Sequence, residues 1–418
     1  MALTSTPVGE DIRRHPAGGD GERRGEGREE GDMRVFVLGA GATGGLLAQL
    51  LRRRGFTVWC GDRDLSRAHR FVGRHLECRS ANARSMRSVA RAAQGCQLLV
   101  NAAPAVYNQT VIRAALRLRV HYLDLASHLS RNPFKAEQFR FDDDFARRRR
   151  LALINAGAAP GLTNLLVAAC ADTLDKVDRV RIRLFEDTQS DTPVSTWSAE
   201  VAHDEAVSRP RIYRQGRFHL GKRFGEAEWF RFPNPIGASR VVLAAQDEAV
   251  TLPRYIPMND LDVKIGGNEM QRLRRWFRQG KLRPSANRVN RRFPDTASPA
   301  DMAELMRRGQ LRNARFAVCV SVSGWRGRQH LERCRCCVFP SLWQLRRDGM
   351  PGAPIAFASA QSAAVFIENL PTHLAGVYPP EALSAKVRAT ILRSMTRRGF
   401  RIRRETTALS PRPVRLKK

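Results

Sequence analysis

Apolar and polar positions follow two different patterns along the chain. Between residues 33 and 160, short apolar runs recur, and each is followed by a segment with apolar residues at helical spacing. We expect strands at 35–38, 56–60, 75–79, 97–102, 121–125 and 151–155, and helices at 43–54, 64–73, 84–94, 107–118 and 134–149. Strands that alternate with helices in this way predict an α/β fold with a doubly wound parallel sheet of the Rossmann type.

After residue 172 the pattern changes. Residues 177–186 alternate apolar and charged side chains, and 211–219 predict a hairpin that turns at Gln215 and Gly216. We also expect strands at 261–265 and 316–322 and helices at 199–207, 268–278 and 299–308. These elements predict an inserted α+β domain with a largely antiparallel sheet, one face of which is exposed to solvent. Such sheets often pair between subunits, so a homodimer is one hypothesis for the oligomeric state.

The domain boundaries follow from these changes of pattern. An Ala-rich helical run returns near residue 351, and basic residues dominate from about 396. Residues 1–32 have no hydrophobic period, so we expect a disordered tail there, and either Met1 or Met33 can be the functional start. The predicted order is a tail at 1–32, a Rossmann domain at 33–160, an α+β domain at 161–350, a return to the Rossmann domain at 351–395 and a basic tail at 396–418.

Composition narrows the class of protein. The 418 residues are 43% hydrophobic, enough for two cores, which excludes fibrous and collagenous chains. A net charge of +32 raises the question of a polyanionic partner. Only eight of the 72 basic residues are lysines, however, and the arginines are spread over every region, which favours a coding bias over a binding stripe. Nucleic-acid binding through residues 272–292 and the segment after Lys386 is therefore the least favoured hypothesis.

The charge-free stretches and the cysteines argue for a cytoplasmic protein. Residues 151–171 and 349–367 approach the length of a spanning helix, but both are interrupted by Gly, Pro and polar residues, and the chain does not start with a secretory signal. We therefore expect no membrane partner. Eight cysteines in a chain of this length fit reduced thiols. Cys334, Cys336 and Cys337 lie near His330 without zinc-ligand spacing, so we predict a hairpin with incidental thiols and no metal.

A glycine-rich segment carries the most informative motif. Gly39-Ala-Gly41-Ala-Thr-Gly44 follows a predicted strand and opens a predicted helix, the context that the dinucleotide-binding motif requires. Gly39 permits the tight turn, Gly41 leaves room for a pyrophosphate and Gly44 lets the helix approach the strand. We expect cofactor contacts from Gly39, Gly41, Ala42, Thr43 and Gly44 at the helix N-terminus.

The end of the second predicted strand bears on the choice of cofactor. Asp62 stands where a carboxylate meets the ribose hydroxyls of NAD, and Arg63 follows it, where a guanidinium can accept the 2′-phosphate of NADP. Both cofactors remain open, with NADP slightly favoured by the basic surroundings. The alternative for Arg63 is an ordinary surface arginine.

Further segments give a resemblance to a family. They are Asn101-Ala-Ala-Pro104, His121-Tyr-Leu-Asp-Leu125 and Gly157-Ala-Ala-Pro-Gly-Leu-Thr-Asn164, with Asp262–Gly266 and Gly376–Glu381 as later landmarks. The chain resembles the saccharopine dehydrogenase family over most of residues 33–390. These are NAD(P)-dependent enzymes that act on C–N bonds of amino acids or polyamines. The resemblance implies that Asn101, Ala102, Ala103 and Pro104 lie against the nicotinamide half of the cofactor, with Asp124 beside the ring.

The sequence also departs from the family pattern. Many members carry an acidic residue near the adenine where this chain has Arg79-Ser80, and residues 324–350 form an enlarged segment that contains cysteines. These differences put the substrate in doubt more than the cofactor.

Hydride transfer needs a group that gives or takes a proton. Tyr107, Asp124 and His203 are the catalytic candidates; a loop cap is the alternative for Asp124, and a surface pair with Glu200 the alternative for His203. A substrate carboxylate could sit at Pro160 and Gly161, which otherwise form a rigid turn.

Arg240 or Lys264 could supply a cation for that carboxylate. We therefore expect an NAD(P)-dependent oxidoreductase that acts on a small amino-acid, imine or polyamine-type substrate. The alternative is a non-catalytic protein that binds or senses the dinucleotide.

Overall fold

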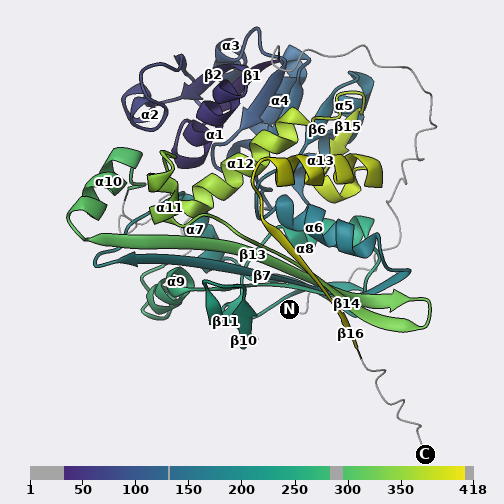
Figure 1. Ribbon diagram of the computed structural model, residues 1–418. Coiled ribbons are helices and arrows are strands. Elements are labelled where there is room, and N and C mark those ends of the chain that lie inside the picture. The colour runs from purple at the N-terminus through teal and green to yellow at the C-terminus, as the bar shows by residue number, and fades with distance from the viewer. Residues whose placement is uncertain (1–32, 130–131, 283–294, 410–418) are drawn as a thin grey trace, which may run out of the picture.

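A parallel sheet forms one half of the molecule. The computed structural model describes residues 33–129, 132–282 and 295–409 (Figure 1). Seven strands lie in the order β15-β6-β5-β4-β1-β2-β3, and all neighbours are parallel. Their bounds are β1 (Arg34–Leu38), β2 (Thr57–Asp62), β3 (Cys78–Ser80), β4 (Leu98–Asn101), β5 (His121–Asp124), β6 (Leu151–Leu153) and β15 (Gly376–Tyr378). The prediction of a doubly wound sheet is confirmed.

Helices bury both faces of this sheet, which explains why its strands are apolar throughout. Val35 and Val37 of β1 belong to one core, and Phe36 and Leu38 belong to another. The first core is covered by α1 (Ala42–Arg53), α2 (Leu65–Val72) and α12 (Pro354–Glu368). The second is covered by α3 (Met86–Ala92), α4 (Asn108–Leu118) and α5 (Asp142–Arg147).

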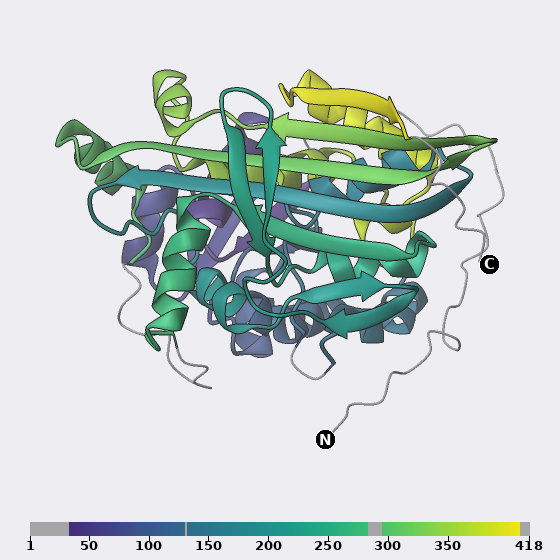
Figure 2. The same ribbon diagram turned by 90° about the horizontal axis from the view of Figure 1, so that it is seen from below.

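The second sheet is mixed and mostly antiparallel. Its order is β10-β11-β12-β7-β13-β14-β16, with β8 and β9 attached beside β12, and only the β12–β7 pair among these is parallel. The bounds are β7 (Lys176–Ser190), β8 (Arg211–Arg214), β9 (Arg217–Leu220), β10 (Glu228–Phe232), β11 (Gly237–Leu243), β12 (Asp260–Gly266), β13 (Leu311–Arg326), β14 (Gln329–Val338) and β16 (Ile402–Ala408). Figure 2 shows the β10–β11 hairpin crossing the outer face of the long strands.

One core joins the two sheets. Side chains of β1, of the buried helix α6 (Leu162–Ala171) and of α12 share a hydrophobic cluster with Val180 and Ile182 on the inner face of β7. The remaining helices lie around this core or at the ends of the second sheet; they are α7 (Ala199–Val207), α8 (Glu248–Tyr255), α9 (Asn268–Arg278), α10 (Pro299–Arg307), α11 (Leu342–Arg347) and α13 (Ala385–Arg397). Within the described ranges, no helix has both the length and the apolar character to cross a membrane.

The C-terminal boundary differs from the prediction. Residues 396–418 were expected to form a basic tail, yet Ile402–Ala408 form strand β16, which pairs with β14 at the edge of the second sheet. Most side chains of β16 are exposed. Its pairing therefore relies on backbone hydrogen bonds and leaves no hydrophobic alternation to detect. The tail predicted at 1–32 and the end of the C-terminal tail, 410–418, lie outside the described residues.

The cysteines also differ in part from the prediction. Cys319 of β13 and Cys336 of β14 face each other and form a disulfide, so the expectation of reduced thiols is wrong for this pair. Cys337 lies in the core between the sheets, on the face opposite Cys336, as expected for adjacent residues of one strand. Bonding to Cys319 leaves Cys336 without the thiolate that a metal would need.

Candidate functional site

The glycine turn after β1 has the geometry of a dinucleotide-binding loop. Gly39 has φ of +94°, and a Cβ there would lie 2.6 Å from the backbone nitrogen of Ala103. A Cβ on Gly44 would lie 1.9 Å from the carbonyl oxygen of Gly39. A Cβ on Gly41 would meet nothing within 4 Å. Gly39 and Gly44 are thus required by packing, whereas the space at Gly41 is free.

Asp62 fixes this loop to the end of β2. Its Oδ2 accepts a hydrogen bond from the Ala40 backbone N–H at 3.0 Å, and its Oδ1 accepts one from Asp64 N–H at 3.1 Å. Among the described residues, the amide groups of Ala42 and Thr43 at the start of α1 have no acceptor. Free N–H groups beside an open position are what a pyrophosphate needs, so these residues fit the predicted cofactor.

Basic side chains lie at the β2–β3 end of the sheet. Arg63 and Arg84 are both exposed, and neither pairs with a carboxylate in the part of the chain that the structure describes. The Ala81 backbone N–H donates to the carbonyl oxygen of Asp62 at 2.9 Å, so the segments that carry the two arginines leave the sheet side by side. Two guanidinium groups thus lie at this end of the sheet, beside Asp62.

Tyr107 is turned toward this same end. Its hydroxyl oxygen accepts from Nε of Arg84, 3.4 Å away, in the segment before α3. Asp124 stands on β5, on the other side of β4 from the strands that lead to Arg84. No described contact brings the Tyr107 hydroxyl to Asp124, so the catalytic role of Tyr107 stays a prediction.

Asp124 is the centre of a buried polar network. The residue is 1% exposed. Its Oδ1 accepts from the Asn155 backbone N–H at 2.8 Å, and its Oδ2 accepts from the Tyr122 hydroxyl at 3.0 Å and from Gln138 Nε2 at 3.1 Å. Three donors satisfy most of the carboxylate's hydrogen-bonding capacity and hold the ends of β5 and β6 together.

Burial decides the charge of Asp124. Loss of solvent raises the pKa of this carboxyl to about 7, against the opposing effect of its three hydrogen bonds, and nearby Asp247 adds to the rise. A carboxyl with this pKa exists in both protonation states at neutral pH, as an acid or base catalyst requires.

The strand end after β4 links the glycine loop to this network. Asn101 accepts the Ala103 backbone N–H at 3.1 Å through Oδ1 and donates from Nδ2 to Asn108 Oδ1 at 2.7 Å. A Cβ on Gly44 would lie 2.8 Å from Cβ of Ala102, so the loop packs directly on this segment. Pro104 follows as the residue before a short 3-10 turn. Asn101–Pro104 therefore lie between the glycine loop and the Asp124 network.

Acidic side chains of the second domain reach the loop after β5. The Ser127 backbone N–H donates to Asp247 Oδ2 at 2.9 Å. Burial raises the pKa of Asp247, and Arg211 opposes this rise. Burial also raises the pKa of Glu205 to about 8, against its bond from Gln246 and with a contribution from Asp247. Asp247 of the second domain thus lies against the loop that follows the carboxyl end of β5, with Glu205 nearby.

The turn at Pro160 and Gly161 has no free donors. The Gly161 N–H donates to Asn164 Oδ1 at 2.9 Å, and the Thr163 N–H donates to the carbonyl oxygen of Ala158 at 3.0 Å. A Cβ on Gly161 would lie 2.1 Å from the carbonyl oxygen of Gly157. These contacts favour the rigid-turn alternative over a carboxylate site.

The second-domain candidates lie on α7, β11 and β12. His203 is buried on α7, and the alternative of a pair with Glu200 stays a prediction. Arg240 is exposed on β11, opposite the exposed Trp229 of β10. Lys264 is buried and donates to Glu228 Oε2 at 3.1 Å. No described contact joins these residues to Asp124, and their roles in catalysis or substrate binding stay predictions.

Sequence reasoning missed the partners of Asp124. The network also contains Asn108, Gln138 and Ser127. Asp247 joins it through its bond with Ser127, from which it is separated by 120 positions in the sequence. Within the described part of the chain, Gln138 Oε1 and Asn155 Nδ2 are buried without a partner. Asn155 was visible in the sequence as a polar break after an apolar strand, and its φ of +57° marks it further.

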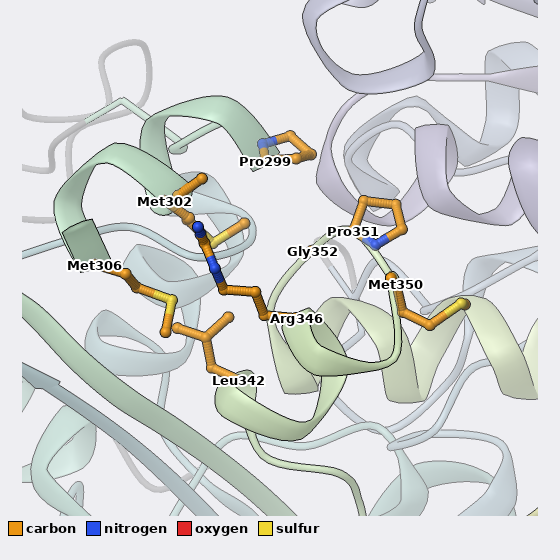
Figure 3. Close-up of a pocket in the computed structure, with 10 residues that line it drawn as sticks. Pro299, Met302, Met306, Leu342, Arg346, Met350, Pro351 and Gly352 are labelled. Atoms are coloured by element: carbon orange, nitrogen blue, oxygen red, sulfur yellow. The ribbon is translucent and has the colours of Figure 1, made fainter.

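A separate hollow lies beside α10 and α11 (Figure 3). It has a volume of about 210 Å³ and a lining rich in methionine, with Met302, Met306, Leu342, Arg346, Met350 and Pro351. Met350 lies 3.2 Å from Arg53, at the C-terminal end of α1. Since α1 begins at the glycine loop, this hollow lies toward the opposite edge of the sheet and is distinct from the predicted cofactor site.

Comparison with known proteins bears on the family. Residues 35–152 match the family model of the saccharopine dehydrogenase NADP binding domain. The apo saccharopine dehydrogenase (L-Glu forming) from Saccharomyces cerevisiae aligns with 90% of this chain and 100% of its own, at a TM-score of 0.65 and 12% identity. That similarity shows a common fold.

Two other solved structures align over most of the chain at lower scores. GenD2 from gentamicin A biosynthesis, in complex with NAD, covers 93% of this chain and 99% of its own at 13% identity, with a TM-score of 0.37. A probable dehydrogenase from Thermotoga maritima covers 90% and 98% at 10% identity, with a TM-score of 0.39. The resemblance to the saccharopine dehydrogenase family is borne out as a similarity: residues 35–152 match the model of its NADP binding domain, and the chain shares the fold of one solved member.

Proposed function

We propose that the protein is an NAD(P)-dependent oxidoreductase that transfers hydride between the nicotinamide and a C–N bond of an amino-acid, imine or polyamine-type substrate. The observation that carries this proposal is the meeting of two features at one edge of the sheet. The open glycine loop after β1 offers free amides for a pyrophosphate, and the buried Asp124 carboxyl lies at the end of β5, on the other side of β4. Ligands in open α/β sheets bind at this edge.

The residues divide the work in a definite way. Ala42 and Thr43 would hold the pyrophosphate, and Asn101 to Pro104 would support the nicotinamide half, whose ring supplies or accepts the hydride when bound. Asp124 would hold the proton that the C–N bond gains or loses, because its pKa lies near 7. The alternative of a structural cap predicts that loss of the Asp124 carboxyl leaves turnover intact.

We further propose NADP as the preferred cofactor. One carboxylate oxygen of Asp62 accepts a hydrogen bond from the Ala40 N–H, and the other accepts one from the Asp64 N–H. These bonds reduce the capacity of Asp62 to accept hydrogen bonds from both ribose hydroxyls. Arg63 and Arg84 lie at the same end, and within the described residues neither forms an ion pair with a carboxylate. A guanidinium pair of this kind favours the added phosphate of NADP.

The test is a substrate screen with the purified full chain. Absorbance of the reduced nicotinamide is followed with NAD and NADP across amino acids, mixtures of keto acids and amines, and polyamines. We expect turnover with at least one class, faster with NADP. Binding of dinucleotide without turnover across the panel would favour the sensing alternative, and absence of dinucleotide binding would refute the proposal altogether.

A further inference from the structure

Two cysteines face each other on neighbouring strands of the parallel sheet. Cys60 of β2 and Cys78 of β3 are direct partners in the strand register. Neighbouring strands lie about 4.8 Å apart, within the range of about 4.4 to 6.8 Å between the Cα atoms of a disulfide. Register partners on neighbouring parallel strands project their side chains to the same face of the sheet, so the two thiols lie side by side.

The two thiols have unequal character. Cys60 is fully buried, and the neighbouring Cys78 thiol, followed by burial, raises the pKa of its thiol. Cys78 is half-buried, and the neighbouring Cys60 thiol is the main cause that lowers the pKa of its thiol, with His69 acting in the same direction against burial. Thiolates are the reactive form of cysteine. Cys78 is also the more exposed of the two, so we assign it as the nucleophile of the pair and Cys60 as the cysteine that resolves the sulfenic acid.

The remaining free cysteines have the opposite character. Burial raises the pKa of Cys96, Cys334 and Cys337 to about 12 and that of Cys170 to about 11. All eight cysteines lie within the described residues, and Cys319 and Cys336 are already joined. Oxidation is thus expected to begin at Cys78.

We propose that Cys60 and Cys78 are a site of oxidative modification, at which a hydroperoxide converts the two thiols into a disulfide between β2 and β3. The Cys78 thiolate attacks one peroxide oxygen, the O–O bond breaks, and hydroxide or an alkoxide leaves, which gives a sulfenic acid. The Cys60 sulfur then attacks the Cys78 sulfur, the S–O bond breaks, and the departing hydroxide takes the Cys60 proton as water. Two thiols are oxidised and one peroxide is reduced.

The position of the pair gives the modification a consequence. Cys60 lies two residues before Asp62 on the same face of β2, and Asp62 holds the glycine loop through Ala40. The charge of Asp62 acts on both thiols. We expect the disulfide to weaken dinucleotide binding about fivefold, the effect of one hydrogen bond worth about 1 kcal/mol. This last step rests on the proposed function, whereas the modification itself does not.

The test treats the full-length protein with hydrogen peroxide, blocks free thiols and maps the peptides by mass spectrometry. Two of the six free thiols should disappear, and a cross-linked peptide should contain Cys60 and Cys78. In Cys60→Ser, dimedone should trap a sulfenic acid on Cys78. The matched control Cys334→Ser removes another half-buried thiol and should behave as wild type.

The outcomes separate the two parts of the inference. First oxidation at any other cysteine, or a Cys78 that is oxidised without forming a cross-link in the wild-type chain, would overturn the proposed site, and neither result depends on the folding of a variant. Titration of the cross-linked protein with NADPH tests the consequence. A cross-linked protein that binds as tightly as the reduced one would overturn the link to the cofactor and leave the site in place.

Discussion

Gly41→Ala is the change that best separates cofactor binding from folding. The backbone of Gly41 is extended, with φ of −86° and ψ of −158°, so alanine can adopt it without strain. The new methyl group would meet no protein atom within 4 Å. It would instead occupy the space in which we place the pyrophosphate, next to the free amides of Ala42 and Thr43.

The expected magnitudes follow from this geometry. Displacing the pyrophosphate weakens two charge-assisted hydrogen bonds, each worth about 1.5 to 3 kcal/mol, so the dissociation constant should rise about 100-fold or more. Stability should hardly change. Alanine is a poorer N-cap than glycine by about 0.5 to 1 kcal/mol, and the lost freedom of the unfolded chain offsets this by about 0.4 to 1 kcal/mol. The melting temperature should stay within about 3 °C of wild type.

The assay is a fluorescence titration with NADPH and NADH, alongside thermal unfolding of the same samples. Gly44→Ala is the matched contrast, since its methyl group would collide with the Gly39 carbonyl oxygen at 1.9 Å and should lower stability. Gly41→Ala protein that melts normally and binds both dinucleotides as wild type would refute the assignment of this loop to the pyrophosphate.

Two further predictions concern cofactor choice and pH. Replacing Arg63 and Arg84 with serine should raise the dissociation constant for NADPH about 10-fold or more and leave that for NADH unchanged. The control Arg117→Ser, which replaces an exposed arginine at the far end of α4, should change neither constant. Equal losses of affinity for both dinucleotides would contradict a 2′-phosphate site. The folded pKa of Asp124, about 7, exceeds its ordinary value of 3.8, so the folded state binds the proton more tightly and its ionisation costs stability as pH rises between these values. Urea unfolding at about pH 5 and pH 8 should therefore show a larger loss of stability with pH in wild type than in Asp124→Asn, and identical pH dependence in the two proteins would contradict the raised pKa.

Much of the first domain could be predicted because its strands and turns are determined by residues close together in the sequence. Strands buried on both faces are apolar throughout, as Val35–Leu38 are, and the turn glycines obey steric rules that need no knowledge of the rest of the chain. The hairpin at Gln215 and Gly216 is a similar case, because both residues have positive φ, of 50° and 74°.

The missed features depend on pairing between distant residues. Glu228–Phe232 and Ile402–Ala408 are strands with several charged or exposed positions, and they exist because they pair with a sheet already formed. The disulfide of Cys319 with Cys336 requires the register of β13 on β14, which the spacing of cysteines does not reveal. The bond from Ser127 to Asp247 likewise depends on how the two domains meet.

Calorimetric titration of the purified full chain with NADPH and NADH tests the central claim most directly. The account predicts saturable binding of one dinucleotide per chain, tighter for NADPH, and competition between the two cofactors for the same site. Absence of binding of either dinucleotide at millimolar concentration would contradict it.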